Sequence, residues 1–180
     1  METIALFGGS FDPPHIGHKA IVEALNDLEF IDRTIVMPTY LNPFKSKSYA
    51  SSELRFQWLE KIFKNLNNVE ISDYEIKQGR KVTTLETTHY LLKKYKKIYL
   101  VVGADNLSSL PSWSGYNELK SLVTFIVASR DDIEIDKSYL QLKIDENISS
   151  SILREKIESS KLPKECATEI EKYYKTKMKN

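Results

Sequence analysis

The stretch from residue 4 to residue 25 constrains the fold most, because an apolar run, a glycine-rich turn and a helix follow one another directly. Residues 4–7 predict a buried strand, and residues 19–25 predict a helix. Gly8 and Gly9 allow the backbone to turn tightly between the two. A helix that begins after such a turn directs free N–H groups and the positive end of its dipole at whatever lies above. The sequence therefore predicts an anion site here, with phosphate as its natural ligand.

Two histidines stand at the start of this helix. His15 and His18 are three residues apart, so they share one face if both lie in the first turn. Imidazoles placed there can donate hydrogen bonds to phosphoryl oxygens. The alternatives are a solvated loop or a two-histidine metal site, but no cysteine or third histidine stands close in sequence. The combination of features favours the phosphate site.

The rest of the chain alternates strands with helices. Apolar runs predict further strands at 34–37, 69–72, 97–102, 122–130 and 139–144. Hydroxyl-rich helix starts precede residues 53, 84 and 150, and a last helix is expected from about 162. In the helix from residue 150, Ser149 is the expected cap and Ile152 is expected to face inward. The helix after residue 52 has a core stripe that includes Trp58, and Arg55 is expected to face the site. The pattern predicts an α/β fold with a parallel sheet flanked by helices.

Size and composition exclude several classes of protein. The 180 residues predict one domain, with a C-terminal helical segment from about residue 149. A net charge of +1 argues against a nucleic-acid-coating protein. No apolar run has membrane-spanning length, and the start of the chain lacks a signal peptide. With only one cysteine, Cys166, we expect a cytoplasmic protein without membrane or nucleic-acid partners.

Three sequence blocks resemble a known family. Gly9-Ser10-Phe11-Asp12-Pro13 and His15-Ile16-Gly17-His18 resemble the signature of nucleotidyltransferases, which join a nucleoside monophosphate from ATP or CTP to a phosphate-bearing acceptor. Residues 103–113 match Gly-x-Asp-x-Leu-x-x-Leu-x-x-Trp, a pattern similar to that of the nicotinate mononucleotide adenylyltransferases. Residues 148–154 resemble the family's Ile-Ser-Ser-Thr-x-hydrophobic-Arg, with Ser151 in place of threonine. The resemblance implies a Rossmann-like nucleotidylyltransferase fold. A GxGxxG turn after the first strand and a GxxxxGK[ST] loop are both absent.

The chain departs from the family pattern at a few positions. Phe44 stands where the family has a histidine, and Glu86 replaces an aspartate in the Thr84–Thr87 block. Asp131-Asp132 replace a Pro-Gly pair, so the loop geometry there is left open. Without the resemblance, each of these residues has a simpler interpretation. Lys45 could be a solvated surface residue, Thr84 and Thr87 part of an ordinary helix start, and Trp113 a core residue.

The resemblance assigns roles to residues. It implies catalytic roles for His15, His18, Lys45 and Arg154. It implies that ATP is bound by Gly8, Gly9, Ser10, Phe11, His15, His18, Gly103, Asp105, Ile148, Ser149, Ser150 and Arg154. It implies that the acceptor nucleotide is bound by Ser10, Phe11, Lys45, Thr84, Thr87, Asp105, Leu107, Trp113 and Arg130. Mg²⁺ is expected as the cofactor, carried by the ATP phosphates without assigned protein ligands.

The implied reaction is transfer of AMP from ATP to nicotinate mononucleotide, which yields nicotinate adenine dinucleotide and pyrophosphate in NAD biosynthesis. A pantetheine-phosphate adenylyltransferase and a cytidylyltransferase are alternatives, although the 103–113 block argues against both. A non-catalytic nucleotide-sensing module is an alternative from another class. The sequence leaves open the preference between nicotinate and nicotinamide mononucleotide. It also leaves the oligomeric state open, as a monomer or a small homo-oligomer.

Overall fold

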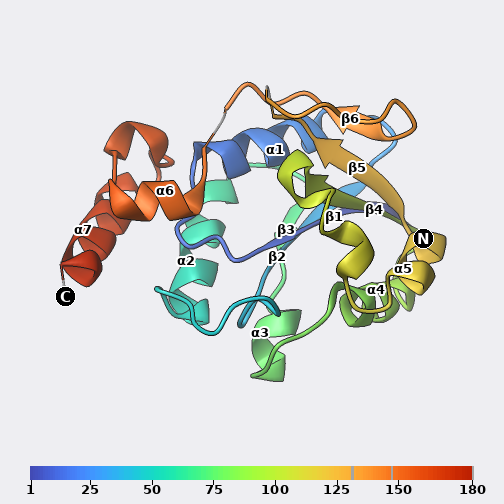
Figure 1. Cartoon of the computed structure of the whole chain (residues 1–180), viewed down its shortest axis with the longest axis horizontal. Helices are drawn as coiled ribbons and strands as arrows, with labels where there is room; N and C mark the ends of the chain where they lie inside the picture. The colour runs from blue at the N-terminus through green and yellow to red at the C-terminus, as the bar shows by residue number, and fades with distance from the viewer. Residues whose placement is uncertain (131, 147, 180) are drawn as a thin grey trace.

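A six-stranded parallel sheet organises the chain (Figure 1). The structure is a computed structural model that describes residues 1–130, 132–146 and 148–179. The strands are β1 (Thr3–Gly9), β2 (Arg33–Pro38), β3 (Val69–Ile71), β4 (Lys97–Gly103), β5 (Thr124–Ala128) and β6 (Leu140–Leu142). The α-helices are α1 (Ile16–Asn26), α2 (Ser52–Phe63), α3 (Tyr74–Gln78), α4 (Thr84–Leu92), α5 (Tyr116–Leu122), α6 (Ser150–Glu155) and α7 (Ala167–Met178). Short 3₁₀ turns are η1 (Ala104–Asn106), η2 (Leu110–Ser112) and η3 (Ser159–Lys161).

The strand order reverses at β1, which lies in the middle of the sheet. The order is β3-β2-β1-β4-β5-β6, and all five strand pairs are parallel. Leu6 of β1 is paired with Ile35 on one side and with Leu100 on the other. In such a sheet, ligands bind beyond the carboxyl ends of the strands at the point of reversal. The predicted α/β fold is confirmed, and the site is expected above the ends of β1, β2 and β4.

Alternate residues of β1 build the two sides of the core. Ala5 and Phe7 pack with helices α1, α2, α6 and α7, whereas Ile4 and Leu6 pack with α4 and α5. This period of two is what a strand buried on both faces requires. Figure 1 shows α6 and α7 beside α2 at one end of the molecule and α4 with α5 at the other. The sheet is therefore covered on both faces, which leaves its carboxyl edge for a ligand.

The C-terminal helices belong to the same core as the sheet. Leu153, Leu162, Cys166, Ile170 and Tyr174 are all buried in the cluster that includes Phe7. Burial raises the pKa of the Cys166 thiol to about 12, so this cysteine is a structural residue. Because sheet and C-terminal helices share one core, we infer that the chain folds as one domain. No helix within the described part of the chain is long and apolar enough to span a bilayer.

Several expectations from sequence are wrong in detail. Residues 122–130 were expected to form one strand, but α5 extends through Leu122 and β5 begins at Thr124. Helix α7 begins at Ala167, five residues later than expected. Ile152 was expected to face inward, yet it is 66% exposed, and Leu153 is the buried residue of α6. The short helix α3 was not expected at all.

Arg55 was expected to face the site, but the structure corrects this. Its guanidinium is fully buried and donates to four backbone carbonyls, those of Ser10, Thr39, Tyr40 and Ala50. These carbonyls belong to the loops after β1 and β2. The buried guanidinium of Arg55 therefore joins the two loops to each other. Of the Asp131-Asp132 pair, Asp131 lies outside the described residues, and Asp132 is in an exposed turn.

Candidate active site

Two adjoining cavities lie at the carboxyl ends of the strands. The first has a volume of about 470 Å³ and is lined by the histidines, Lys45 and Arg154; we name it the histidine cavity. The second has a volume of about 540 Å³ and is lined by Thr39, Thr83, Thr84 and Thr87; we name it the threonine cavity. The residues that line both are Gly8, Gly9, Asn42, Val101, Asn106 and Trp113. Each cavity is of a size that holds a small-molecule ligand, and the end of β1 forms their common floor.

The histidine pair is held by the start of helix α1. His15 is the N-cap, and its Nδ1 accepts hydrogen bonds from the backbone N–H groups of Gly17 (3.1 Å) and His18 (3.4 Å). The Nδ1 of His18 accepts from the backbone N–H of His15 at 3.1 Å. The two rings stack with centroids 3.6 Å apart. Since each Nδ1 is an acceptor, each neutral ring has its proton on Nε2 and can donate from that atom.

Both histidines are neutral at neutral pH. Burial and the positive charge of Arg130 lower the pKa of His15 to about 4. Burial and the neighbouring His15 lower the pKa of His18 well below its ordinary value. The pair therefore supplies two N–H donors without bringing a charged imidazolium beside the cations of the same cavity.

Gly17 is required by the position of the His15 ring. A Cβ atom at residue 17 would lie 2.9 Å from two atoms of that ring, which is closer than real contacts allow. Phe11 has φ of 51°, in the left-handed region. Its ring and the His18 ring form a T-shaped pair with centroids 4.8 Å apart. The spacing of the His-x-Gly-His motif thus follows from the capping geometry.

Arg154 and Lys45 place two positive charges in the histidine cavity, and neither forms an ion pair with another described residue. The Nη1 of Arg154 donates to the Asp12 carbonyl at 2.6 Å, and its guanidinium lies over the Tyr49 ring at 4.4 Å. Partial burial and the charge of Arg154 lower the pKa of Lys45. The nearby carboxylate of Asp12 is occupied by other donors. Two neighbouring cations, beside a carboxylate that other donors already hold, favour a polyanionic ligand.

The carboxylate of Asp12 is enclosed by three donors. It accepts hydrogen bonds from the backbone N–H groups of Tyr49 (2.7 Å) and Ala50 (3.0 Å) and from the hydroxyl of Tyr174. The hydroxyl of Ser150 also donates to the Pro13 carbonyl at 2.9 Å. The first and third motifs are thereby joined at residues 12–13. Ser149 is the N-cap residue of α6, as expected, but its hydroxyl pairs with that of Ser151 and not with a backbone N–H of the helix.

Asp105 and Arg130 close the far side of the histidine cavity. Arg130 Nη1 donates to Asp105 Oδ2 at 3.3 Å. A Cβ atom at residue 103 would lie 2.7 Å from Asp105 Oδ1, so Gly103 makes room for this carboxylate. Among the described residues, no three His, Cys, Asp or Glu side chains gather closely enough to bind a metal ion.

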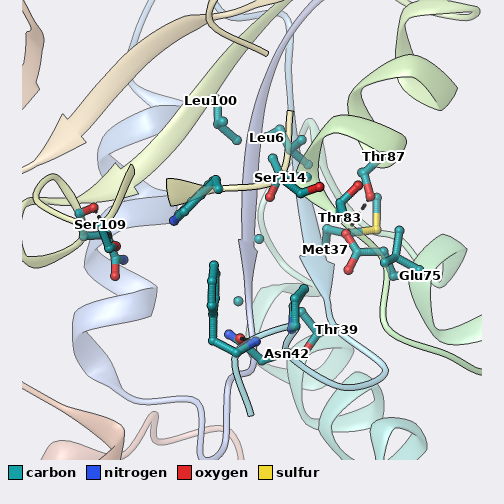
Figure 2. Close-up of a pocket in the computed structure, with 18 of the residues that line it drawn as sticks. Leu6, Met37, Thr39, Asn42, Glu75, Thr83, Thr87, Leu100, Ser109 and Ser114 are labelled. Carbon is teal, nitrogen blue, oxygen red and sulfur yellow. Dashed lines mark hydrogen bonds between the residues drawn. The ribbon is translucent and has the colours of Figure 1, made fainter. Parts of the chain in front are cut away.

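The threonine cavity contains a buried acid. Thr83 caps α4 by accepting from the Glu86 N–H at 3.2 Å, and the hydroxyl of Thr87 donates to Glu75 Oε2 at 2.7 Å. Figure 2 shows Glu75, Thr83 and Thr87 together on one side of this cavity. Burial, with a smaller effect from Glu86, raises the pKa of Glu75 to about 7. The carboxyl is therefore partly protonated near neutral pH.

The loop after β4 brings Trp113 to the cavities. Gly115 has φ of 69°, and a Cβ atom there would lie 2.3 Å from Leu85 Cδ2, so this loop lies directly against α4. Trp113 is half-buried; it packs against the core and also lines both cavities. The two roles weighed from sequence are thus compatible.

The structure gathers most of the expected site residues, with some redistribution. All residues expected at ATP line the histidine cavity. Of those expected at the acceptor, only three line the threonine cavity, namely Thr84, Thr87 and Trp113. Five others line the histidine cavity: Ser10, Phe11, Lys45, Asp105 and Arg130. Leu107 lines neither cavity and packs against the core.

Sequence reasoning missed some residues. Glu75 lies in the unexpected helix α3, where one acid in a five-residue segment gives no signal. Asn42 and Asn106 line both cavities. In the sequence, only their positions after the strands β2 and β4 could have indicated a place at the site.

The buried Glu75 predicts a pH dependence of stability. Its pKa is near 4.5 when unfolded and about 7 when folded, so the folded state retains a proton in this window. The stabilisation is complete below pH 4.5 and is lost as the pH rises through 7. From pH 5 to pH 8, the wild type should lose about 2.5 kcal/mol of unfolding free energy relative to Glu75→Gln. Urea denaturation at several pH values measures this difference.

The histidines act in the opposite direction. Their lowered pKa values make the unfolded state bind more protons between about pH 4 and 6.5, so stability rises with pH there. In Glu75→Gln the opposing effect of the carboxyl is removed, so the unfolding free energy of this variant should rise between about pH 4 and 6.5. The exposed Glu60→Gln is the matched control, and its curve should parallel the wild type. A Glu75→Gln curve parallel to the wild type would contradict the assignment.

Comparison with known proteins identifies the relatives of this chain. The family model described as cytidylyltransferase-like matches residues 6–156. A probable nicotinate-nucleotide adenylyltransferase of Sulfurimonas denitrificans is 62% identical, over 97% of this chain and 96% of that protein. A protein of the same description from Campylobacter jejuni is 47% identical, over 98% and 99% of the two chains.

The fold has solved counterparts. Plasmodium falciparum nicotinic acid mononucleotide adenylyltransferase, solved with NaAD, superimposes with a TM-score of 0.82 at 21% identity, over 100% of this chain and 99% of that one. At this identity the likeness concerns the fold alone. On the family match and the two close relatives, the chain belongs to the cytidylyltransferase-like family and, within it, to the nicotinate-nucleotide adenylyltransferases.

Proposed function

We propose that this enzyme transfers AMP from ATP to nicotinate mononucleotide, with release of pyrophosphate. The observation that supports this most is the junction of the two cavities at Gly8 and Gly9. On one side lie the cations and N–H donors that a triphosphate requires. On the other lie threonines and an indole suited to a flat nucleotide base. Two nucleotides held in these cavities would meet above the end of β1.

The chemistry requires positioning more than proton transfer. The phosphate of the acceptor is already an anion, so no general base is needed, and direct attack on the α-phosphorus needs no protein nucleophile. The Nε2–H groups of His15 and His18 would stabilise charge on the α-phosphoryl and bridging oxygens. Lys45 and Arg154 would hold the β- and γ-phosphates as the pyrophosphate leaves. Because the histidines stay neutral, their donation is constant over the physiological pH range.

The carboxylates of the histidine cavity fit a Mg²⁺ ion that arrives with ATP. Asp12 is fully hydrogen-bonded, which leaves Asp105 and Glu146 as the remaining acids of the lining. Mg²⁺ favours phosphate oxygens and water with one or two carboxylates. Asp105, which is half exposed, would be its protein contact. When bound, the ion would neutralise charge on the leaving pyrophosphate.

The same proposal covers partners and location. The substrates are small molecules, ATP and nicotinate mononucleotide, and neither nucleic acid nor membrane takes part. We propose a cytoplasmic enzyme that acts as a monomer or small homo-oligomer. A pure sensor is disfavoured because the His-x-Gly-His pair is intact and lines the same cavity as Lys45 and Arg154.

A comparison of acceptors tests the function. Pyrophosphate release is measured with ATP, Mg²⁺ and, separately, nicotinate mononucleotide, nicotinamide mononucleotide and phosphopantetheine. Fastest turnover is expected with nicotinate mononucleotide. Faster turnover with phosphopantetheine would keep the chemistry but change the acceptor. Binding of ATP without turnover of any acceptor would favour the sensor.

Gly17→Ala tests the placement of the histidine pair. Alanine is more favourable than glycine in a helix by about 1 kcal/mol, so the substitution should not destabilise helix α1 itself. The added methyl group would displace the His15 ring, and with it the stacked His18. We expect kcat to fall on the order of 100-fold, which is the range for loss of one positioned hydrogen-bond donor. His18→Ala, which removes such a donor directly, should lower kcat to a similar extent.

The matched control is Glu23→Ala, an exposed alanine substitution on the same helix. It should leave kcat unchanged. A Gly17→Ala enzyme with wild-type kcat would show that the stacked arrangement is not needed for turnover.

A further inference from the structure

We propose that Phe44 determines acceptor specificity: its ring forms an aromatic wall opposite Trp113, and the two rings hold the pyridinium ring of the acceptor nucleotide between them. The inference rests on the proposed function, since it names the group that the threonine cavity selects. It assigns a role to a large apolar side chain that is 68% exposed.

The sheet topology places the two rings on opposite sides of one strand. Phe44 follows β2 and Trp113 follows β4, and β1 lies between these strands. Both rings line the threonine cavity, and Gly8 and Gly9 form its floor without side chains. Figure 2 shows Asn42, two residues before Phe44, across the cavity from Ser114, the neighbour of Trp113.

The spacing suits a flat ring between two others. Adjacent strands are about 4.8 Å apart, so β2 and β4 are separated by roughly 10 Å. A ring stacked on both faces needs about 7 to 8 Å between its two neighbours, twice the carbon contact distance. Side chains of the loops that follow β2 and β4 can therefore lie on the two faces of one flat ring.

The loop that presents Phe44 has a fixed local geometry. Asn42 Oδ1 accepts from the Phe44 N–H at 2.8 Å, and the Asn42 carbonyl accepts from the Lys45 N–H at 2.9 Å. Phe44 lines the threonine cavity, whereas Lys45 lines the histidine cavity. Consecutive residues of one turn thus serve the two cavities, and ligand binding would bury the exposed ring.

The chemistry explains the selectivity. The pyridine nitrogen of a pyridine mononucleotide is bonded to ribose and has a positive charge, which aromatic faces attract. A flexible, uncharged chain such as that of phosphopantetheine gains neither stacking nor this attraction. Two aromatic walls therefore favour a planar cationic ring, while the polar groups near Thr84 contact its substituent.

The test compares ligands with and without the ring. Calorimetry measures binding of nicotinate mononucleotide and of ribose 5-phosphate to the wild type, Phe44→Leu and Phe44→Trp. Phe44→Leu should weaken binding of the mononucleotide about tenfold and leave ribose 5-phosphate unchanged. Phe44→Trp should restore binding. Tyr40→Leu, an exposed aromatic of the same loop that lines neither cavity, is the control and should match the wild type.

Each result supports or overturns the inference. Equal losses for both ligands would mean that Phe44 only shapes the loop, and no loss would mean that it does not touch the ring. Either result, obtained while the wild type still turns over nicotinate mononucleotide, overturns the role of Phe44 and keeps the proposed function. A wild type that neither binds nor turns over this nucleotide overturns both.

Discussion

The enclosed carboxylate of Asp12 is the interaction on which the site depends. It ties the loop after β1 to the loop after β2 through Tyr49 and Ala50, and to helix α7 through Tyr174. Its backbone carbonyl binds Arg154 of α6. Buried polar groups are costly unless satisfied, so these segments are held to one arrangement. Arg55 reinforces it by donating to carbonyls of the same two loops.

This arrangement determines the electrostatics of the cavity. Because the Asp12 carboxylate is occupied, it does not form an ion pair with Lys45 or Arg154, and their charges remain available to a ligand. The neutral histidines add donors and avoid repulsion from these cations. The cations and N–H donors of the cavity are thus in place before any ligand arrives, and such preorganisation is the condition for strong electrostatic stabilisation of a transition state.

The sequence predicted the local parts of the site better than the distant contacts. The strand, the glycine turn and the histidine pair lie within 16 residues, so periodicity and capping chemistry indicate them. The bond from Tyr174 to Asp12 spans 162 residues, and no local pattern indicates it. Arg55 was misplaced because a periodic pattern shows which face of a helix is buried but not what a buried charge binds. Glu75 and Ile152 lie on helices too short for periodicity to be reliable.

The central claim is that the site holds two nucleotides for direct attack without a covalent protein intermediate. The most direct test uses ATP with a sulfur atom of defined configuration on the α-phosphorus and nicotinate mononucleotide as acceptor. The configuration of the product dinucleotide is then determined by phosphorus NMR. A single in-line displacement predicts inversion at this phosphorus. Retention would show two successive displacements through a nucleotidylated side chain and would contradict the account.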